Sequence, residues 1–145
     1  MYKPKNFTLS ELAHPDLIKQ YGDRLWLAFD PIILRFAQFI RDRYGPCTIN
    51  NASAKDRGWR TMGSSVGADL SAHKLGRALD ISINAITNRT AIGSKERAAE
   101  YAKVRAEVLK LPEWSMINFE RNLSGKPITW LHCDTYNRPA REFDA

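Results

Sequence analysis

Apolar residues recur at helical spacing in the first third of the chain. The pattern is clearest after Asp30 and Pro31, a pair that suits the cap and the first residue of a helix. Gly45 and Pro46 interrupt it, so we expect a helix over residues 31–44. Its buried face should carry the apolar residues that repeat at this spacing, namely Ile33, Phe36, Ala37 and Ile40.

Two shorter helices are expected before this one. Thr8 and Glu11 have the spacing of a capping box, which satisfies backbone amides at a helix start. His14 and Pro15 suit a second helix start, and that helix should end before Gly22. We therefore expect His14 to be a solvated residue at a helix end and not part of a site.

Strict alternation of apolar and polar residues begins later in the chain. Residues 78–83 alternate between two faces and predict a strand. Residues 115–120 and 128–135 are expected to form a hairpin around residues 122–127. A further short strand is expected at residues 47–50.

One helix interrupts these strands and one long segment shows no period. Ser94 suits the cap of a helix over residues 95–110, which Pro112 ends. Helices followed by interrupted strands predict an α+β fold, a small and mostly antiparallel sheet flanked by helices. Residues 51–70 are rich in Ser, Gly, Ala and Asp, and loops of this length are more often functional than idle.

Composition fits one domain that spans residues 1–145, with 43% hydrophobic and 26% charged residues. No apolar run approaches the roughly 20 residues of a membrane span, and the N-terminal sequence does not resemble a secretory leader. We therefore expect synthesis in the cytoplasm of a cell or phage host, without membrane insertion. Cys47 and Cys133 are too few for a disulfide scaffold and are expected to be buried thiols.

The formal net charge is +6, from 22 Lys and Arg against 16 Asp and Glu. Such a balance either keeps the protein in solution or favours anionic partners, for example nucleic acid or an acidic cell-wall polymer. The basic residues are spread along the whole chain and form no stripe, so nucleic acid is not an expected partner.

Three potential metal ligands can meet on one face of the expected sheet. Asp80 and His132 both point away from the apolar side of their strands. His73 lies seven residues before Asp80, and Gly76 between them permits a tight reversal. Two imidazoles and one carboxylate form a three-ligand set for zinc that leaves a fourth position for water. Alternatively, Asp80 accepts a structural hydrogen bond and no metal binds.

Two blocks of sequence resemble the zinc D-Ala-D-Ala carboxypeptidase and endopeptidase family, peptidase family M15. Residues 71–80 match its Ser-x-His-x-x-Gly-x-Ala-x-Asp signature. Residues 129–134 resemble its second block, a Trp-x-His followed by another residue and an acid. Residues 58–60 resemble the Gly-aromatic-Arg that precedes the first block, and residues 7–12 resemble the start of small phage-encoded members.

The resemblance implies a hedgehog-like zinc peptidase fold in which His73, Asp80 and His132 hold Zn²⁺. It also implies that Arg60 binds a carboxylate or carbonyl of the substrate and that Ser71 supports the site near the metal. Members of this family cut peptide bonds in bacterial cell-wall stem peptides, as carboxypeptidases or as endolysin-type endopeptidases of bacteriophages. We therefore expect a monomeric zinc metallopeptidase that degrades peptidoglycan and acts at the cell wall or is carried in a virion.

One position departs from the family's pattern. Many active members carry an acid three residues before the last histidine, as general base, whereas this sequence has Thr129. Glu120, on the neighbouring strand, is the first candidate to take the role. Asp134 is the second, although it can instead orient a ligand histidine as a hydrogen-bond acceptor.

The register of the hairpin decides whether Glu120 reaches the metal. Pairing the two strands around Gly125 sets Asn118 opposite His132 and Glu120 opposite Trp130. A slip of two residues preserves the faces and puts Glu120 opposite His132, and it is equally compatible with the sequence.

Two alternatives from other classes remain. One is a catalytically inactive module of the same fold that serves a phage as a structural or cell-wall-binding component. The other is a non-haem iron oxygenase, whose metal is also held by two histidines and one carboxylate. The six residues between His73 and Asp80 argue against the oxygenase, which is expected to have a tight His-x-carboxylate spacing.

Overall fold

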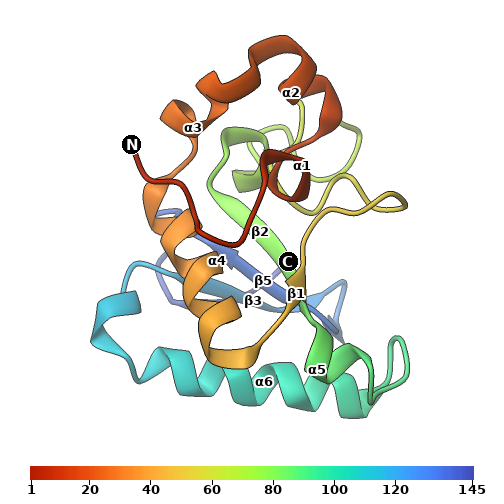
Figure 1. Ribbon diagram of the computed structural model, residues 1–145. Coiled ribbons are helices and arrows are strands. Elements are labelled where there is room, and N and C mark those ends of the chain that lie inside the picture. Colours follow the sequence, from red (N-terminus) through yellow and green to blue (C-terminus); the bar gives the residue numbers. More distant parts are fainter.

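A six-stranded, mostly antiparallel sheet forms the centre of the computed structural model, which describes residues 1–145 (Figure 1). The strands run in the order β1-β2-β5-β3-β4, and β6 pairs in parallel with β3. Their bounds are β1 Cys47–Thr48, β2 Ala78–Ile83, β3 Asn118–Leu123, β4 Lys126–Pro127, β5 Leu131–Asp134 and β6 Glu142–Asp144. The expected α+β class with a small sheet is therefore confirmed.

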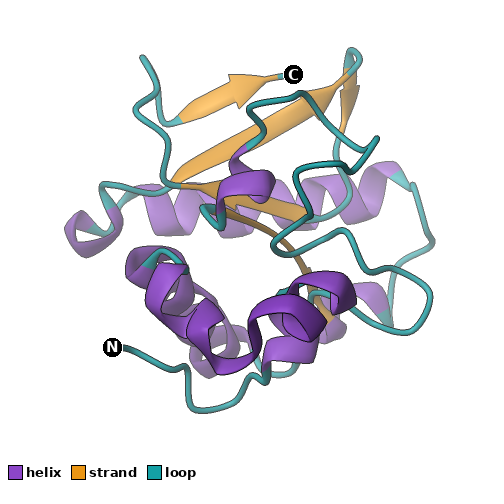
Figure 2. Ribbon diagram, turned by 90° about the horizontal axis from the view of Figure 1, so that it is seen from above, coloured by secondary structure: helices purple, strands orange, loops and turns teal.

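Helices flank the sheet, and the two long ones are α4 (Pro31–Tyr44) and α6 (Lys95–Leu109). The short ones are α1 Leu9–Leu12, α2 Pro15–Tyr21, α3 Leu25–Ala28 and α5 Asn84–Thr87, with 3-10 turns η1 Gly22–Arg24, η2 Ala72–Leu75 and η3 Pro112–Trp114. Figure 2 shows the N-terminal helices on one side of the strands and the C-terminus on the other. No helix has the length and apolar character needed to span a membrane.

The apolar core lies on one face of the sheet. Leu79, Ile81 and Leu131 on the strands pack there in one cluster with residues of α4 and α6. The Tyr101 hydroxyl of α6 accepts a hydrogen bond from the Ile83 amide at 2.9 Å, which ties this helix to β2. Every second residue of β2 and β5 therefore faces away from the core, as the alternation predicts.

The expected helix starts are confirmed. Asp30 accepts a hydrogen bond from the Ile32 amide at 2.8 Å, and Ser94 accepts one from the Arg97 amide at 3.1 Å. Glu11 accepts one from the Thr8 amide at 2.8 Å, as in a capping box. His14 caps α2 by accepting from the Asp16 amide, so it serves a helix end as expected.

The expected hairpin is wrong in its bounds. Residues 115–117 are not in the ladder, because the amides of Ser115 and Ile117 donate to carbonyls of η3. The turn is shorter than expected, since β3 reverses directly into β4 through Ser124 and Gly125, whose φ angles are 51° and 75°. Residues 128–130 then leave the sheet before β5 begins.

Of the two registers that the sequence leaves open, the structure has the one with Glu120 opposite His132. Asn118 pairs with Asp134 and Phe119 with Cys133, so the next pair sets Glu120 opposite His132. Residues 128–130 lie outside the ladder between β4 and β5. The pairing of β3 with β5 is therefore not fixed by the turn at Gly125, which is why it differs by two residues from the register that the turn predicts.

The irregular segment 51–70 is held in place at Gly58. Asn50 Oδ1 accepts hydrogen bonds from the Arg57 and Gly58 amides, both at 3.0 Å. A Cβ atom on Gly58 would lie 2.0 Å from the Leu12 carbonyl oxygen, so only glycine fits this close approach. The segment thus contains no regular element but is fixed against the N-terminal helices.

Candidate metal centre

His73 enters the site from η2 and is almost fully buried, at 2% exposure. Its Nδ1 lies 2.9 Å from the Gly58 carbonyl oxygen and donates a hydrogen to it. That bond fixes the ring and leaves the Nε2 lone pair free to bind a metal. Gly76, with φ 65°, ends η2 in a left-handed turn and starts the chain back toward β2, as the sequence predicts.

Asp80 and His132 are direct partners across the β2–β5 pair. Asp80 Oδ1 lies 2.7 Å from His132 Nδ1, and Asp80 Oδ2 lies 3.4 Å from His73 Nε2. His73 Nε2 and His132 Nδ1 lie 3.3 Å apart. The three residues predicted from strand faces are thus brought together, with their ligand atoms all within 4.8 Å of one another.

The donor set fits a zinc ion. Bonds of about 2.0–2.1 Å at tetrahedral angles separate neighbouring ligand atoms by about 3.4 Å. The separations from His73 Nε2 to His132 Nδ1 and to Asp80 Oδ2 are 3.3 and 3.4 Å. The shorter 2.7 Å contact of His132 with Asp80 is a hydrogen bond. This buried His-Asp-His group can therefore hold a metal ion.

Charges at the site are strongly coupled. Burial lowers the pKa of His132, but its contacts with Asp134 and Asp80 outweigh burial and raise that pKa to about 9. Burial raises the pKa of Asp80, but the two histidines outweigh it and hold that pKa well below the usual range. The trio therefore carries a proton on His132 and a negative charge on Asp80 near neutral pH.

Asp134 is completely buried and faces the far side of His132. Its Oδ2 lies 3.6 Å from His132 Nε2 and accepts two hydrogen bonds from Arg138, at 2.8 and 2.5 Å. Its Oδ1 accepts from Asn118 Nδ2 at 3.0 Å. Burial raises the pKa of Asp134, but His132, Arg138 and Asn118 outweigh it and hold that pKa well below the usual range. Asp134 is thus placed to orient His132.

Glu120 lines the same cleft as the three potential ligands, and its carboxylate is incompletely bonded. The residue is 8% exposed, and its buried Oε1 has no hydrogen-bond partner. Burial raises the pKa of Glu120 above its ordinary value, although the nearby His132 charge opposes the shift. Glu120 is therefore an unpaired acceptor in the same cleft as the three potential ligands, where it can accept a proton.

Arg60 and Ser71 line this cleft, which has a volume of about 450 Å³. Arg60 Nη2 lies 3.3 Å from Asp80 Oδ2, and its Nε donates to the Asp56 carbonyl oxygen. Its side chain is only 9% exposed, so Arg60 is not a mobile surface cation. Burial lowers the pKa of Arg60, while the charges of Asp80 and Asp56 oppose the shift.

The sequence analysis missed the C-terminal wall of the cleft. Arg138, Tyr136 and Phe143 all line it. The Arg138 guanidinium lies 3.6 Å from the centre of the Phe143 ring, and the Tyr136 hydroxyl donates to the Leu70 carbonyl at 2.5 Å. The only trace in the sequence is a cluster of arginines and aromatic residues after Asp134, which has no periodicity.

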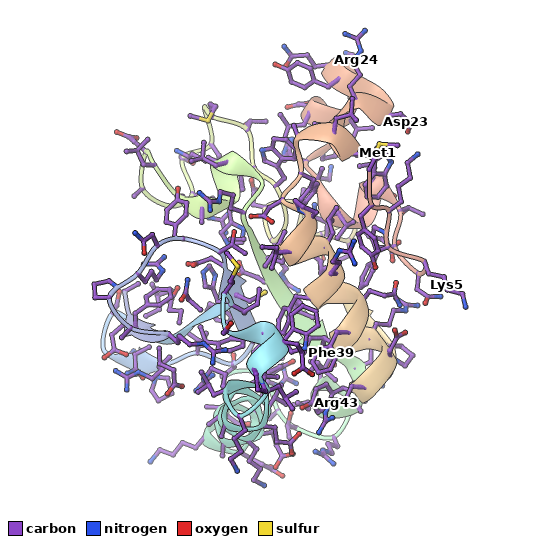
Figure 3. The ribbon with its side chains drawn as sticks, turned by 90° about the vertical axis from the view of Figure 1, so that its left-hand side faces the viewer. Met1, Lys5, Asp23, Arg24, Phe39 and Arg43 are labelled. Atoms are coloured by element: carbon purple, nitrogen blue, oxygen red, sulfur yellow. The ribbon has the colours of Figure 1, made fainter.

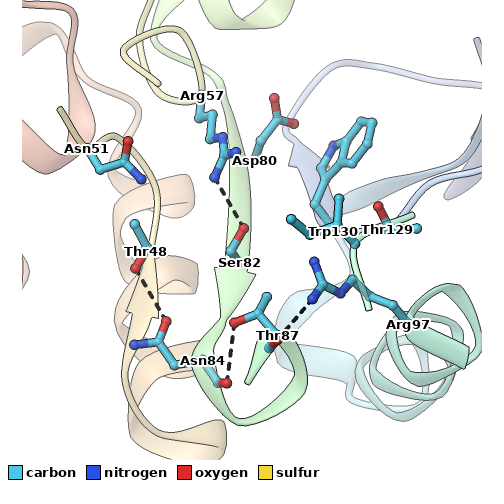
Figure 4. A pocket seen from close by; sticks show the side chains of 11 residues that line it. Thr48, Asn51, Arg57, Asp80, Ser82, Asn84, Thr87, Arg97, Thr129 and Trp130 are labelled. Atoms are coloured by element: carbon cyan, nitrogen blue, oxygen red, sulfur yellow. Dashed lines mark hydrogen bonds between the residues drawn. The ribbon is translucent and has the colours of Figure 1, made fainter. Parts of the chain in front are cut away.

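Thr129 lies in a neighbouring pocket and does not line the metal cleft. Trp130 lines this pocket (Figure 4) and also borders the metal cleft. The position where the family's pattern has an acid therefore faces a different cavity from Glu120.

Comparison with known proteins adds no relative. No family model matches the chain, and neither a curated protein nor a solved structure does.

Proposed function

We propose that the protein is a zinc-dependent peptidase that hydrolyses peptide bonds in bacterial peptidoglycan stem peptides. One observation carries the proposal: His73, Asp80 and His132 converge with ligand spacing in a cleft that also holds the unpaired carboxylate of Glu120. The three ligand positions belong to the two blocks that resemble peptidase family M15. The hedgehog-like peptidase fold of that family is part of the proposal.

Glu120, Asp134 and Arg60 have separate roles in the proposed reaction. When bound, zinc polarises a carbonyl and lowers the pKa of water. Glu120 takes the proton from the attacking water and returns it to the amine that leaves. Asp134 holds the His132 ring from its far side, and Arg60 binds the carbonyl or carboxylate of the substrate.

The proposed partner is an anionic cell-wall polymer, which the net charge of +6 favours electrostatically. The protein acts as a monomer on this polymer, as a phage endolysin or as a carboxypeptidase.

Mass spectrometry of purified peptidoglycan tests the proposal. The wild type should release fragments with new peptide termini, and a chelator should abolish their release. Added zinc should restore it. Glu120→Gln is the matched variant, since it should bind zinc and release no fragments. Intact peptidoglycan after incubation with the zinc-loaded wild type contradicts the peptidase assignment.

A second function has a specific observation in its favour. Thr129 cannot transfer a proton and stands where many active members of peptidase family M15 carry the base, as in a phage module that has kept the fold for binding only. Sedimentation with intact peptidoglycan, combined with no release of fragments, would support this binding module.

A further inference from the structure

A second pocket of about 510 Å³ adjoins the metal cleft along strand β2 (Figure 4). Asp80 and Trp130 border both spaces, so the two form neighbouring parts of one surface. We call this space the Arg57 pocket. Its other lining residues are mainly hydroxyl and amide side chains: Thr48, Asn51, Ser82, Asn84, Thr87 and Thr129, with Ile92 and Arg97.

Arg57 is a cation without a counter-charge. Its guanidinium donates one long hydrogen bond, from Nη1 to Ser82 Oγ at 3.4 Å, and forms no ion pair (Figure 4). Its backbone is fixed, because the Arg57 carbonyl accepts from the Asp80 amide at 2.7 Å and its own amide donates to Asn50. A half-buried arginine held in this way is preorganised for an anionic ligand.

The pocket as a whole is positive. Arg97 is buried and donates to Thr87 and Thr90, with no carboxylate partner. Asp80 is the only acid in the lining, and His73, His132 and Arg60 already surround its carboxylate. Two arginines therefore stand in a pocket whose single negative charge is already paired.

The spacing along β2 sets the distance from the metal ligands. Ser82 lies two residues after Asp80 on the same face, which corresponds to about 7 Å. Because Arg57 contacts Ser82, its guanidinium is displaced from the metal site by a similar length. An extended peptide spans about 3.3–3.6 Å per residue, so this length corresponds to about two residues.

We propose that the Arg57 pocket binds a substrate carboxylate that lies within two residues of the cleaved bond. The proposal rests on the proposed peptidase function and specifies its substrate class as an acidic peptide. Arg57 forms the ion pair, and the hydroxyl and amide groups around it receive the remaining polar atoms. Arg57 is a binding residue that selects the substrate.

Two synthetic stem peptides that carry either Glu or Gln next to the cleaved bond test the selectivity. The zinc-loaded wild type should cleave the Glu peptide with a kcat/KM about 10–100-fold higher. In Arg57→Gln this ratio should fall close to one, and Arg57→Lys should give an intermediate ratio. Arg24→Gln is the charge-matched control, because Arg24 is exposed at the far end of the molecule (Figure 3) and should leave the ratio unchanged.

Binding to the zinc-loaded Glu120→Gln variant separates this proposal from the peptidase assignment. Calorimetric titration should show tighter binding of the Glu peptide, and a second change, Arg57→Gln, should remove the difference. If the zinc-loaded wild type cleaves neither peptide but this preference persists, the peptidase assignment is wrong and the pocket assignment stands. Equal affinities and equal rates for the two peptides overturn the pocket assignment, whatever the rate of cleavage.

Discussion

His73 Nε2 and His132 Nδ1 lie 3.3 Å apart, although 59 residues separate the two histidines in the chain. The lone pair of His73 Nε2 points to this spot, and the proton on His132 Nδ1 lies in the hydrogen bond to Asp80. Asp80 adds a negative charge to the same point, with oxygens 2.7 and 3.4 Å from these nitrogens. The arrangement therefore favours a positive charge at its centre, and a metal ion can supply it.

Loss of either of two ligands should remove the metal. We expect the wild type to bind a single zinc equivalent, and His73→Ala and Asp80→Ala to lose it. Their melting temperatures should fall by about 5–10 °C relative to the zinc-saturated wild type, because bound metal stabilises only the folded state. Elemental analysis and calorimetry provide the two measurements.

His14→Ala is the control for these variants, since His14 caps α2 and takes no part in the site. It should keep the full zinc equivalent and lose only about 1 kcal/mol of stability from the cap. Full zinc retention in both His73→Ala and Asp80→Ala would show that the metal binds elsewhere.

The metal-free protein should lose stability as the pH rises from 6.5 to 9. Folding raises the pKa of His132 from 6.5 to about 9, so the folded state holds this proton more tightly. The resulting stabilisation is complete below pH 6.5 and is lost as the pH passes through about 9. Urea unfolding in EDTA measures it. Asp80→Asn should flatten the dependence, because the variant removes a charge that raises this pKa.

Zinc binding should show the opposite dependence on pH. The metal must displace the proton from His132, so its apparent affinity should rise by up to about tenfold per pH unit between 6.5 and 9. Competition with a chelator of known affinity at three pH values checks this. The same affinity at all three values would argue against His132 as a ligand.

Glu120→Gln should separate chemistry from metal binding. The amide has nearly the same shape but cannot accept the proton, so turnover should fall by roughly 10²–10⁴ while zinc and fold are kept. Glu113→Gln, at an exposed residue of η3, is the matched control and should turn over normally. If Glu120→Gln is active and Asp134→Asn is inactive with zinc bound, the role of base belongs to Asp134.

Arg60→Lys should lower kcat/KM by about tenfold with zinc content unchanged. Lysine keeps the charge but cannot contact Asp80 and Asp56 while also presenting a fork to the substrate. Steady-state kinetics and elemental analysis of one preparation give both values. Wild-type kinetics in Arg60→Lys would show that Arg60 pairs with Asp80 and does not bind the substrate.

Gly58→Ala should weaken metal binding by displacing the carbonyl that orients His73. The added Cβ would lie 2.0 Å from the Leu12 carbonyl oxygen, so the Gly58 carbonyl must move away from His73. We expect a loss of about 1–3 kcal/mol in stability and about 10–100-fold in zinc affinity. Gly63→Ala, in the same segment with open space around its Cβ position, should change neither. Equal zinc affinities in the two variants would contradict the orienting role of Gly58.

Short-range patterns predicted much of this fold and the three potential ligands. The caps at Asp30 and Ser94 depend on a few neighbouring residues, and the structure confirms both. The alternation in β2 and β5 sorted Asp80 and His132 to one face, because the side-chain period of a strand is independent of its partners.

Long-range pairing could not be predicted in the same way. Two registers of β3 against β5 keep the same faces, so face matching alone did not place Glu120. The strand β6 and the contact of Arg138 with Asp134 come from a segment without periodicity. Whether Arg57 has an acidic partner depends on which residues the fold brings near it. No pattern in the sequence predicts that it has none.

The close approach of Gly58 to Leu12 gives the metal site a place in the order of folding. Helix α1 supplies no potential ligand, but its Leu12 lies against Gly58, whose carbonyl oxygen accepts the hydrogen bond that orients His73. During synthesis α1 leaves the ribosome before all three potential ligands, and His132 emerges 52 residues after Asp80. A nascent chain that stops before His132 holds at most two of the three potential ligands, so the three-ligand group forms only after β5 has been made.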